Sequence, residues 1–291
     1  MLLLQLIADG VISGCVIGVV AITFAYVYTT TGVFHVAHAG VYTLGGYVAW
    51  YLTEKGTPFV ATLALSAIIC AGVGALVQRA IYEPLARRNA SPLVLLIASL
   101  GVLAVLQNAV AIAFTPNILQ FSLPWRLNTL ALGPVVVSMP QALTALAGIV
   151  ILAALMWFSS RTLLGSRIRA VASNRQLAEI VRLRPYQVYV YVLAIASGLV
   201  ALSSALVGID QAIQPYTGVL VLLTAVIAVI AGGIGSLPGA FIVSIALSVL
   251  QNIVLVMVPG RWSIAFTFGL FIVFILVKPT GLFRTRLRRV T

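Results

Sequence analysis

The sequence has 291 residues, of which 62% are hydrophobic and 8% are charged, and its formal net charge is +12. So few polar side chains cannot cover a soluble globule of this size, and the composition therefore excludes a soluble domain. Apolar runs of roughly 20 residues match helices that cross a hydrocarbon core about 30 Å thick, and not the alternating short segments of a membrane barrel. The sequence predicts an all-α, polytopic integral membrane protein, with residues 1–291 in one transmembrane domain.

Nine apolar segments are predicted to span the membrane. In chain order they are residues 3–28, 35–53, 58–80, 93–115, 137–160, 187–209, 217–233, 238–258 and 261–279. Two of them weaken the count, because 35–53 begins with two histidines and 217–233 has only 17 residues before a glycine-rich break. Eight spans with one re-entrant piece is the alternative. The break itself, Gly232 to Gly239, lacks the lysine of a phosphate-binding loop and is predicted to be a sharp reversal between two helices.

The cations are clustered along the chain. Three hydrophilic stretches, residues 79–88, 161–184 and 278–289, hold 14 of the 17 Lys and Arg residues. Because short cytoplasmic segments carry an excess of Lys and Arg, all three stretches are expected in the cytosol. With nine spans, this puts the N-terminus outside and the C-terminus in the cytoplasm. The first residues lack a cationic region and a cleavage site, so the first apolar run is expected to be kept as a span.

The longest hydrophilic break, residues 161–185, also has the pattern of a short helix. Ser173 and Gln176 have the spacing of a capping box, and Pro185 is expected to end the helix. Three residues at i, i+3 and i+4 then share an apolar face: Leu177, Ile180 and Val181. A solvated basic loop near anionic lipid headgroups would explain the charge alone. A surface helix that a cytosolic partner grips would explain the apolar face as well.

The sequence contains no recognisable catalytic set. Its five carboxylates lie in loops or at predicted span ends, and no two are spaced for acid–base catalysis: Asp9, Glu54, Glu83, Glu179 and Asp210. The span interiors hold no Lys or Arg. Proton- or sodium-driven carriers usually place ionisable groups at mid-membrane, so the pattern disfavours a self-powered carrier. We therefore expect a protein that is not an enzyme and that takes its energy from elsewhere.

Seven polar residues in or next to the predicted spans are candidates for a translocation pathway. His35 and His38 are three residues apart, which is also the spacing of a metal pair, but no carboxylate or thiol is near in sequence. Hydrogen bonds between helices and a place along the pathway are the other two interpretations of this pair. Val105-Leu-Gln-Asn108 recurs 144 residues later as Val249-Leu-Gln-Asn252, which is typical of two structural halves. The full set of candidates is Thr31, His35, His38, Gln107, Asn108, Gln251 and Asn252.

Several short motifs, taken together and in order, carry a family resemblance. They are Gly32-Val-Phe-His-Val-Ala-His-Ala-Gly40, Gly45-Gly46-Tyr47, Tyr82-Glu-Pro-Leu85, Leu106-Gln107-Asn108, Gly165-Ser-Arg-Ile-Arg169, Gly232-Gly-Ile-Gly-Ser236 and Lys278-Pro-Thr-Gly-Leu282. Over nearly its whole length the chain resembles the membrane permease of bacterial ABC importers for branched-chain amino acids, the first of the two paralogous permeases in those systems.

The resemblance implies a set of partners and a location. It implies a sister permease, two cytoplasmic ABC ATPase subunits that bind the ATP, and an extracytoplasmic solute-binding protein, all at the bacterial inner membrane. No cofactor is implied for this chain. By the same resemblance, a coupling helix that docks on the ATPase comprises Ser173, Asn174, Arg175, Gln176, Leu177, Ala178, Glu179, Ile180 and Val181.

The resemblance leaves the end of that helix and the solute open. Similar permeases usually read Gly-Ile-Asn where this chain has Arg182-Leu183-Arg184, so the usual helix-ending glycine is absent. Similar permeases also serve urea, short amides and aromatic or other hydrophobic acids. A self-sufficient channel or secondary carrier is the alternative from another functional class.

Overall fold

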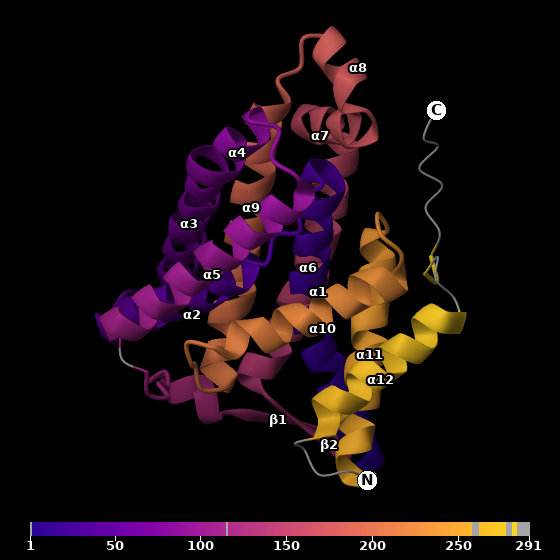
Figure 1. Cartoon of the computed structure of the whole chain (residues 1–291). Coiled ribbons are helices and arrows are strands. Elements are labelled where there is room, and N and C mark those ends of the chain that lie inside the picture. The colour runs from indigo at the N-terminus through magenta and orange to yellow at the C-terminus, as the bar shows by residue number, and fades with distance from the viewer. Residues whose placement is uncertain (1, 115, 258–261, 278–280, 284–291) are drawn as a thin grey trace.

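The computed structural model describes residues 2–114, 116–257, 262–277 and 281–283, and it is a bundle of helices (Figure 1). Each of the nine predicted spans corresponds to one helix: α1 (Leu2–Thr31), α2 (His38–Glu54), α3 (Phe59–Val77), α5 (Pro92–Phe114), α6 (Met139–Arg161), α9 (Pro185–Asp210), α10 (Thr217–Gly232), α11 (Leu237–Met257) and α12 (Ser263–Val277). The prediction of a polytopic helical membrane protein is confirmed. The cation-rich segment 278–289 lies outside the described residues except for 281–283.

Not all nine helices are long enough to cross a bilayer on their own. Within the described residues, six are long and apolar enough: α1, α3 with its continuation to Arg87, α5, α6, α9 and α11. The helices α2, α10 and α12 have 17, 16 and 15 residues. The continuation of α3 consists of a π-helical turn, η1 (Gln78–Tyr82), and α4 (Glu83–Arg87). The count of nine spans therefore stays a prediction.

The shortness of α2 follows from a connection that folds back into the bundle. Gly32, with a φ of +71°, ends α1 in a conformation that favours glycine. The chain then returns along α1, because the ring of His38 at the start of α2 lies 2.9 Å from the hydroxyl of Thr23, two turns before the end of α1. The first turn of α10 meets the same region, since Gly218 packs against the backbone of Ala39. Helices α2 and α10, which correspond to the two uncertain predicted spans, thus begin side by side.

Glycines bring α1 and α11 into close contact. Gly10, Gly14 and Gly18 face Val249, Ile245 and Phe241 of the antiparallel helix α11. A Cβ atom built at Gly10 would lie 2.5 Å from the Cα atom of Val249. Because lipid tails are as apolar as Leu, helices in a bilayer associate through such close packing rather than through hydrophobic burial. These three glycines, spaced four residues apart, therefore let α1 pack closely against α11.

Two connections were predicted with unequal success. The reversal between α10 and α11 is confirmed, with φ values of +103° at Gly233 and +99° at Gly235 and with Pro238 in the first turn of α11. The expectation of helices alone is incomplete, because β1 (Thr129–Leu132) and β2 (Val135–Ser138) form an antiparallel hairpin around Gly133, which has a φ of +63°. The valine run after the Gly-Pro turn favours a strand, so residues 137 and 138 belong to β2 and not to α6. A 3-10 turn, η2 (Pro124–Leu127), precedes the hairpin.

Replacing Gly10 by Leu is expected to destabilise the bundle. The added side chain would overlap the backbone of α11, and overpacking of this kind costs about 1–3 kcal/mol. The measurement is the melting temperature of the detergent-solubilised protein, with size-exclusion chromatography used to monitor the loss of folded protein on heating. Gly101→Leu is the matched control, because nothing lies within 4 Å of a Cβ atom at that helical glycine. Equal melting temperatures for the two variants would contradict the proposed role of this contact.

Candidate functional site

The predicted hydrophilic break between the fifth and sixth spans has the expected bounds. Helix α6 ends at Arg161 and α9 begins at Pro185. The break contains two helices, α7 (Leu163–Ser173) and α8 (Arg175–Ile180), which protrude beyond the bundle at the end opposite the hairpin (Figure 1). Helix α7 was not predicted, although its signal is visible in the sequence. Thr162 is its N-cap and accepts a hydrogen bond from the backbone N–H of Gly165 at 3.0 Å.

The predicted capping box of the second helix is wrong. Ser173 is the last residue of α7, and Asn174 is the N-cap of α8, with its side chain accepting from the N–H of Leu177 at 3.0 Å. The backbone at Asn174 is extended because it joins two helices, and this conformation lets its short side chain reach the first turn of α8. The sequence pattern placed the start one residue too early because it did not anticipate α7.

The predicted end of this helix at Pro185 is also wrong. Arg182 adopts the left-handed conformation, with a φ of +61°. Its N–H bonds the carbonyl of Glu179, and the N–H of Leu183 bonds the carbonyl of Ala178, both at 3.0 Å. This pair of bonds is a Schellman motif, in which glycine normally takes the left-handed position. The helix therefore ends without a glycine, and Pro185 instead occupies the first position of α9.

The apolar face of α8 points away from the rest of the chain. Leu177, Ile180 and Val181 are 58%, 75% and 69% exposed, whereas Ala178 on the other side of the helix is buried. Neighbouring apolar side chains exposed in a polar segment are typical of a surface that a partner covers.

Tyr186 connects α8 to the end of the α3–α4 helix. The guanidinium groups of Arg175 and Arg87 lie 4.9 and 4.8 Å from the centroid of its ring. Each arginine also pairs with a carboxylate four residues away on its own helix, Arg175 with Glu179 at 3.1 Å and Arg87 with Glu83 at 2.6 Å. A groove of about 500 Å³ lies beside these residues and is lined from η1, α4, α8 and α9. The contacts hold α8 against two of the longest helices.

The two histidines form buried hydrogen bonds between helices. His35 Nδ1 lies 2.8 Å from the hydroxyl of Tyr82, which donates to Ser99 Oγ at 2.8 Å, and Ser99 also accepts from the N–H of Ala37. Because the hydroxyl of Thr23 donates to a carbonyl of α1, His38 Nε2 donates to Thr23. The remaining nitrogens, His35 Nε2 and His38 Nδ1, are buried without a partner in the described structure. No group of three or more His, Cys, Asp or Glu residues lies together among the described residues.

The other candidate pathway residues lie on α1, α5 and α11. The hydroxyl of Thr31 bonds to its own helix, and Gln107 is buried with its amide nitrogen unpaired. Gln251 donates to Thr267 on α12 at 2.6 Å. The two asparagines of the repeated motif have the same geometry, because Asn108 and Asn252 each donate to the carbonyl four residues earlier. None of these residues lines the cavities described next.

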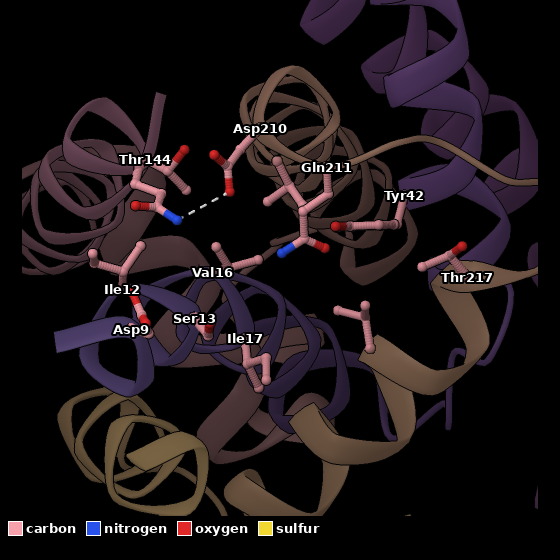
Figure 2. A pocket seen from close by; sticks show the side chains of 13 residues that line it. Asp9, Ile12, Ser13, Val16, Ile17, Tyr42, Thr144, Asp210, Gln211 and Thr217 are labelled. Atoms are coloured by element: carbon pink, nitrogen blue, oxygen red, sulfur yellow. Dashed lines mark hydrogen bonds between the residues drawn. The ribbon is translucent and has the colours of Figure 1, made fainter. Parts of the chain in front are cut away.

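A cavity lies at the opposite end of the molecule from α8, between α1, α2, α6, α9 and α10. It has a volume of about 160 Å³ and is lined by Asp9, Ile12, Ser13, Val16, Ile17, Tyr42, Gln141, Thr144, Val207, Asp210, Gln211, Thr217 and Val221. Figure 2 shows Asp210, Gln211 and Tyr42 on one side of this space and Ser13, Val16 and Ile17 of α1 on the other. A smaller cavity adjoins it, sharing Tyr42, Gln211 and Thr217 and adding Tyr47 and Ser204.

Sequence reasoning missed this cavity. The carboxylates of Asp9 and Asp210 belong to helices far apart in the chain, and each looked like an isolated charge near a span end. The structure brings both to the lining of one cavity, which their positions in the sequence did not predict. The only signal in the sequence was their rarity, since the chain has five carboxylates in all.

Replacing Tyr186 by Ala is expected to loosen α8. Each cation–π contact at an exposed site contributes about 0.5–1 kcal/mol, and the variant loses two of them. Amide hydrogen exchange of residues 175–183 should accelerate severalfold. Tyr191→Ala removes an exposed tyrosine of the same helix and should leave this exchange unchanged. Equal exchange in the two variants would contradict the role given to Tyr186.

Replacing Arg182 by Gly is expected to have the opposite effect. A left-handed backbone costs a residue with a Cβ atom about 1–2 kcal/mol, and glycine does not bear this cost. Exchange of the α8 amides should slow in Arg182→Gly. The matched control is Arg184→Gly, because Arg184 has a φ of −103° and gains nothing from the change. Faster exchange in Arg182→Gly would show that the Schellman geometry is not what ends the helix.

Comparison with known proteins agrees with this architecture. A solved structure titled PsaBC from Streptococcus pneumoniae in complex with Fab has a TM-score of 0.52 and 16% identity, covering 94% of this chain and 91% of the other. That likeness concerns the fold. Two curated relatives are the high-affinity branched-chain amino acid transport system permease proteins BraD of Pseudomonas aeruginosa and LivH of Escherichia coli K12. They are 28% and 27% identical, over 96% of this chain and 95% and 94% of theirs.

The match to a family model covers almost the whole described bundle. Residues 6–275 match the model described as the branched-chain amino acid transport system / permease component. This range extends from the first turns of α1 to the last turn of α12, so it includes both the cavity and α8. The chain belongs to the family of branched-chain amino acid transport system permease components.

Proposed function

We propose that this chain is the membrane-spanning translocation subunit of an ABC importer for branched-chain or related hydrophobic amino acids in the bacterial inner membrane. Membership of the permease family supports the transport role, and the names of the BraD and LivH relatives support the class of solute. The chain itself is proposed to hydrolyse nothing. Two cytoplasmic ABC ATPase subunits bind the ATP, a sister permease completes the membrane pair, and an extracytoplasmic binding protein delivers the solute.

The exposed apolar face of α8 is the observation that carries this proposal. A motorless permease needs a surface on which an ATPase can push, and α8 is a short capped helix outside the bundle with apolar side chains directed outward. It is also held to α3–α4 and α9 through Tyr186, so a force applied there would reach two long helices. We therefore propose that residues 173–181 contact the ATPase subunit, inside a cytoplasmic coupling loop of residues 161–185.

The seven polar residues of the spans remain proposed pathway residues, for conformations in which the bundle opens. In the present conformation His35, His38 and Gln107 are buried, and each has a side-chain nitrogen without a partner in the described structure. Burying an unpaired polar group costs free energy, which would be recovered if movement of α2 or α5 exposed it to water or solute.

A double variant of α8 tests the proposal. Leu177→Asp with Ile180→Asp places two carboxylates in the proposed contact, where an interfacial anchor contributes about 2 kcal/mol or more. The variant should fail to retain the ATPase subunits during affinity purification and should lose ATP-driven leucine uptake in proteoliposomes. The chain should remain folded, because neither side chain is buried in the bundle.

Leu127→Asp is the matched control. Leu127 is 82% exposed and lies near the hairpin at the other end of the molecule, so this variant should retain the ATPase subunits. Normal ATPase retention and uptake in the double variant would refute the proposed docking. Undiminished gradient-driven transport by the purified chain alone would instead favour the self-sufficient carrier.

A further inference from the structure

The cavity of Figure 2 contains negative charge that no described cation neutralises. Asp210 accepts from the hydroxyl of Ser138 at 2.8 Å and from the amide of Gln141 at 3.4 Å, and Asp9 accepts from the amide of Gln5 at 3.1 Å. All three donors are neutral. Among the described residues, the ion pairs are Glu83 with Arg87 and Glu179 with Arg175, both near α8. The cavity therefore offers two carboxylates to a cation.

The nearest described arginine does not fill this role. The guanidinium of Arg126 lies 3.5 Å from the backbone carbonyl of Asp210 and 3.1 Å from the amide oxygen of Gln120. It is bound to neutral oxygens and not to the carboxylate. An ammonium group supplied by a ligand would satisfy the remaining lone pairs of Asp210 and Asp9, since a carboxylate can accept about four hydrogen bonds.

A second observation points to a ligand. Tyr47 lines the smaller adjoining cavity, is fully buried, and its hydroxyl has no partner in the described structure. Buried hydroxyls are normally hydrogen-bonded, so this one requires an acceptor or a water molecule. Tyr42 and Thr217 line both cavities and supply further hydroxyls between Tyr47 and the two carboxylates. The two adjoining cavities thus have acceptors at one end and donors at the other.

The wall between these polar ends is apolar and branched. Ile12, Val16 and Ile17 form it from α1, with Val207 from α9 and Val221 from α10. A space with an anionic end, hydroxyl donors and an aliphatic wall matches the three parts of one class of molecule: an α-amino acid with an ammonium, a carboxylate and a branched aliphatic side chain.

We infer that this cavity is a binding site for the transported amino acid within the permease. Asp210 and Asp9 hold the ammonium, the hydroxyls of Tyr42 and Tyr47 face the carboxylate, and the aliphatic residues of α1 contact the side chain. The inference rests on the proposed function and adds to it a site on the side of the membrane opposite α8. The solute would stop there after leaving the binding protein and before crossing.

Replacing Asp210 by Asn separates a ligand role from a structural one. Asn keeps an oxygen that accepts from Ser138, so the link between α9 and α6 is retained, but it lacks the negative charge. The measurement is the binding of radiolabelled L-leucine to the purified permease–ATPase complex without the binding protein. Affinity should fall roughly 10- to 100-fold, as expected for loss of a charged hydrogen-bonded partner. Leucine bound to the unmodified complex should be displaced by 3-methylbutylamine, which has the ammonium alone, and less by 4-methylpentanoate, which has the carboxylate alone.

Glu54→Gln is the matched control, because Glu54 is a carboxylate near the same end of the molecule that does not line either cavity. This variant should bind leucine as the unmodified complex does. Unchanged leucine affinity in Asp210→Asn, or an unmodified complex that transports leucine with ATP but binds none alone, would overturn the inference and leave the proposed function standing. Absence of ATP-driven transport by the unmodified complex would instead refute the proposed function. If Asp210→Asn does not assemble, Asp9→Asn gives the same test, and unchanged affinity there would likewise overturn the inference.

Discussion

Close packing of α1 against its neighbours is the constraint on which the rest of the structure depends. A bilayer gives apolar helices no reason to leave the lipid for one another, so association relies on dispersion contacts and interhelical hydrogen bonds. Helix α1 supplies both, through glycines that admit the backbone of α11 and through Thr23, which bonds to His38. It is also the most deeply buried of the long apolar helices, with 78% of its most apolar window inside the structure. The cavity and the folded-back connection to α2 are both built on this helix.

Buried polar groups determine where α2 begins. In a dry interior, a connection such as residues 32–37 leaves backbone and side-chain groups that must find partners within the protein. The bonds of His35 with Tyr82 and of Ala37 with Ser99 supply them from η1 and from the first half of α5. Tyr82 lies in the π-helical turn, where the wider helix changes the direction of the side chains. Segments η1 and α5 therefore hold the connection that precedes α2.

A single helix joins the two ends of the molecule to which we assign functions. Helix α9 begins at Pro185 beside α8 and ends at Asp210 in the cavity, a length of about 39 Å for its 26 residues. Tyr186 in its first turn contacts Arg175 of α8, and Asp210 at its end accepts hydrogen bonds from the start of α6. Alternating access requires that a movement made in the cytosol changes the opposite side, and a continuous helix with contacts at both ends is a simple connection for it.

Hydrophobicity and charge by themselves determined the helical membrane fold, the positions of nine helices to within about three residues, and the bounds of the break at 161–185. These features are local, because a helix in lipid must satisfy its own backbone within one continuous segment. Only the tertiary structure decided that Asn174 and not Ser173 begins α8, that Arg182 ends it, and that the histidines bond to Thr23 and Tyr82. It also decided that Asp9 and Asp210, 201 positions apart in the numbering, face one cavity. The physical reason is that caps and cavities depend on which segments meet in space, and in a chain made almost entirely of apolar residues the sequence pattern does not specify those meetings.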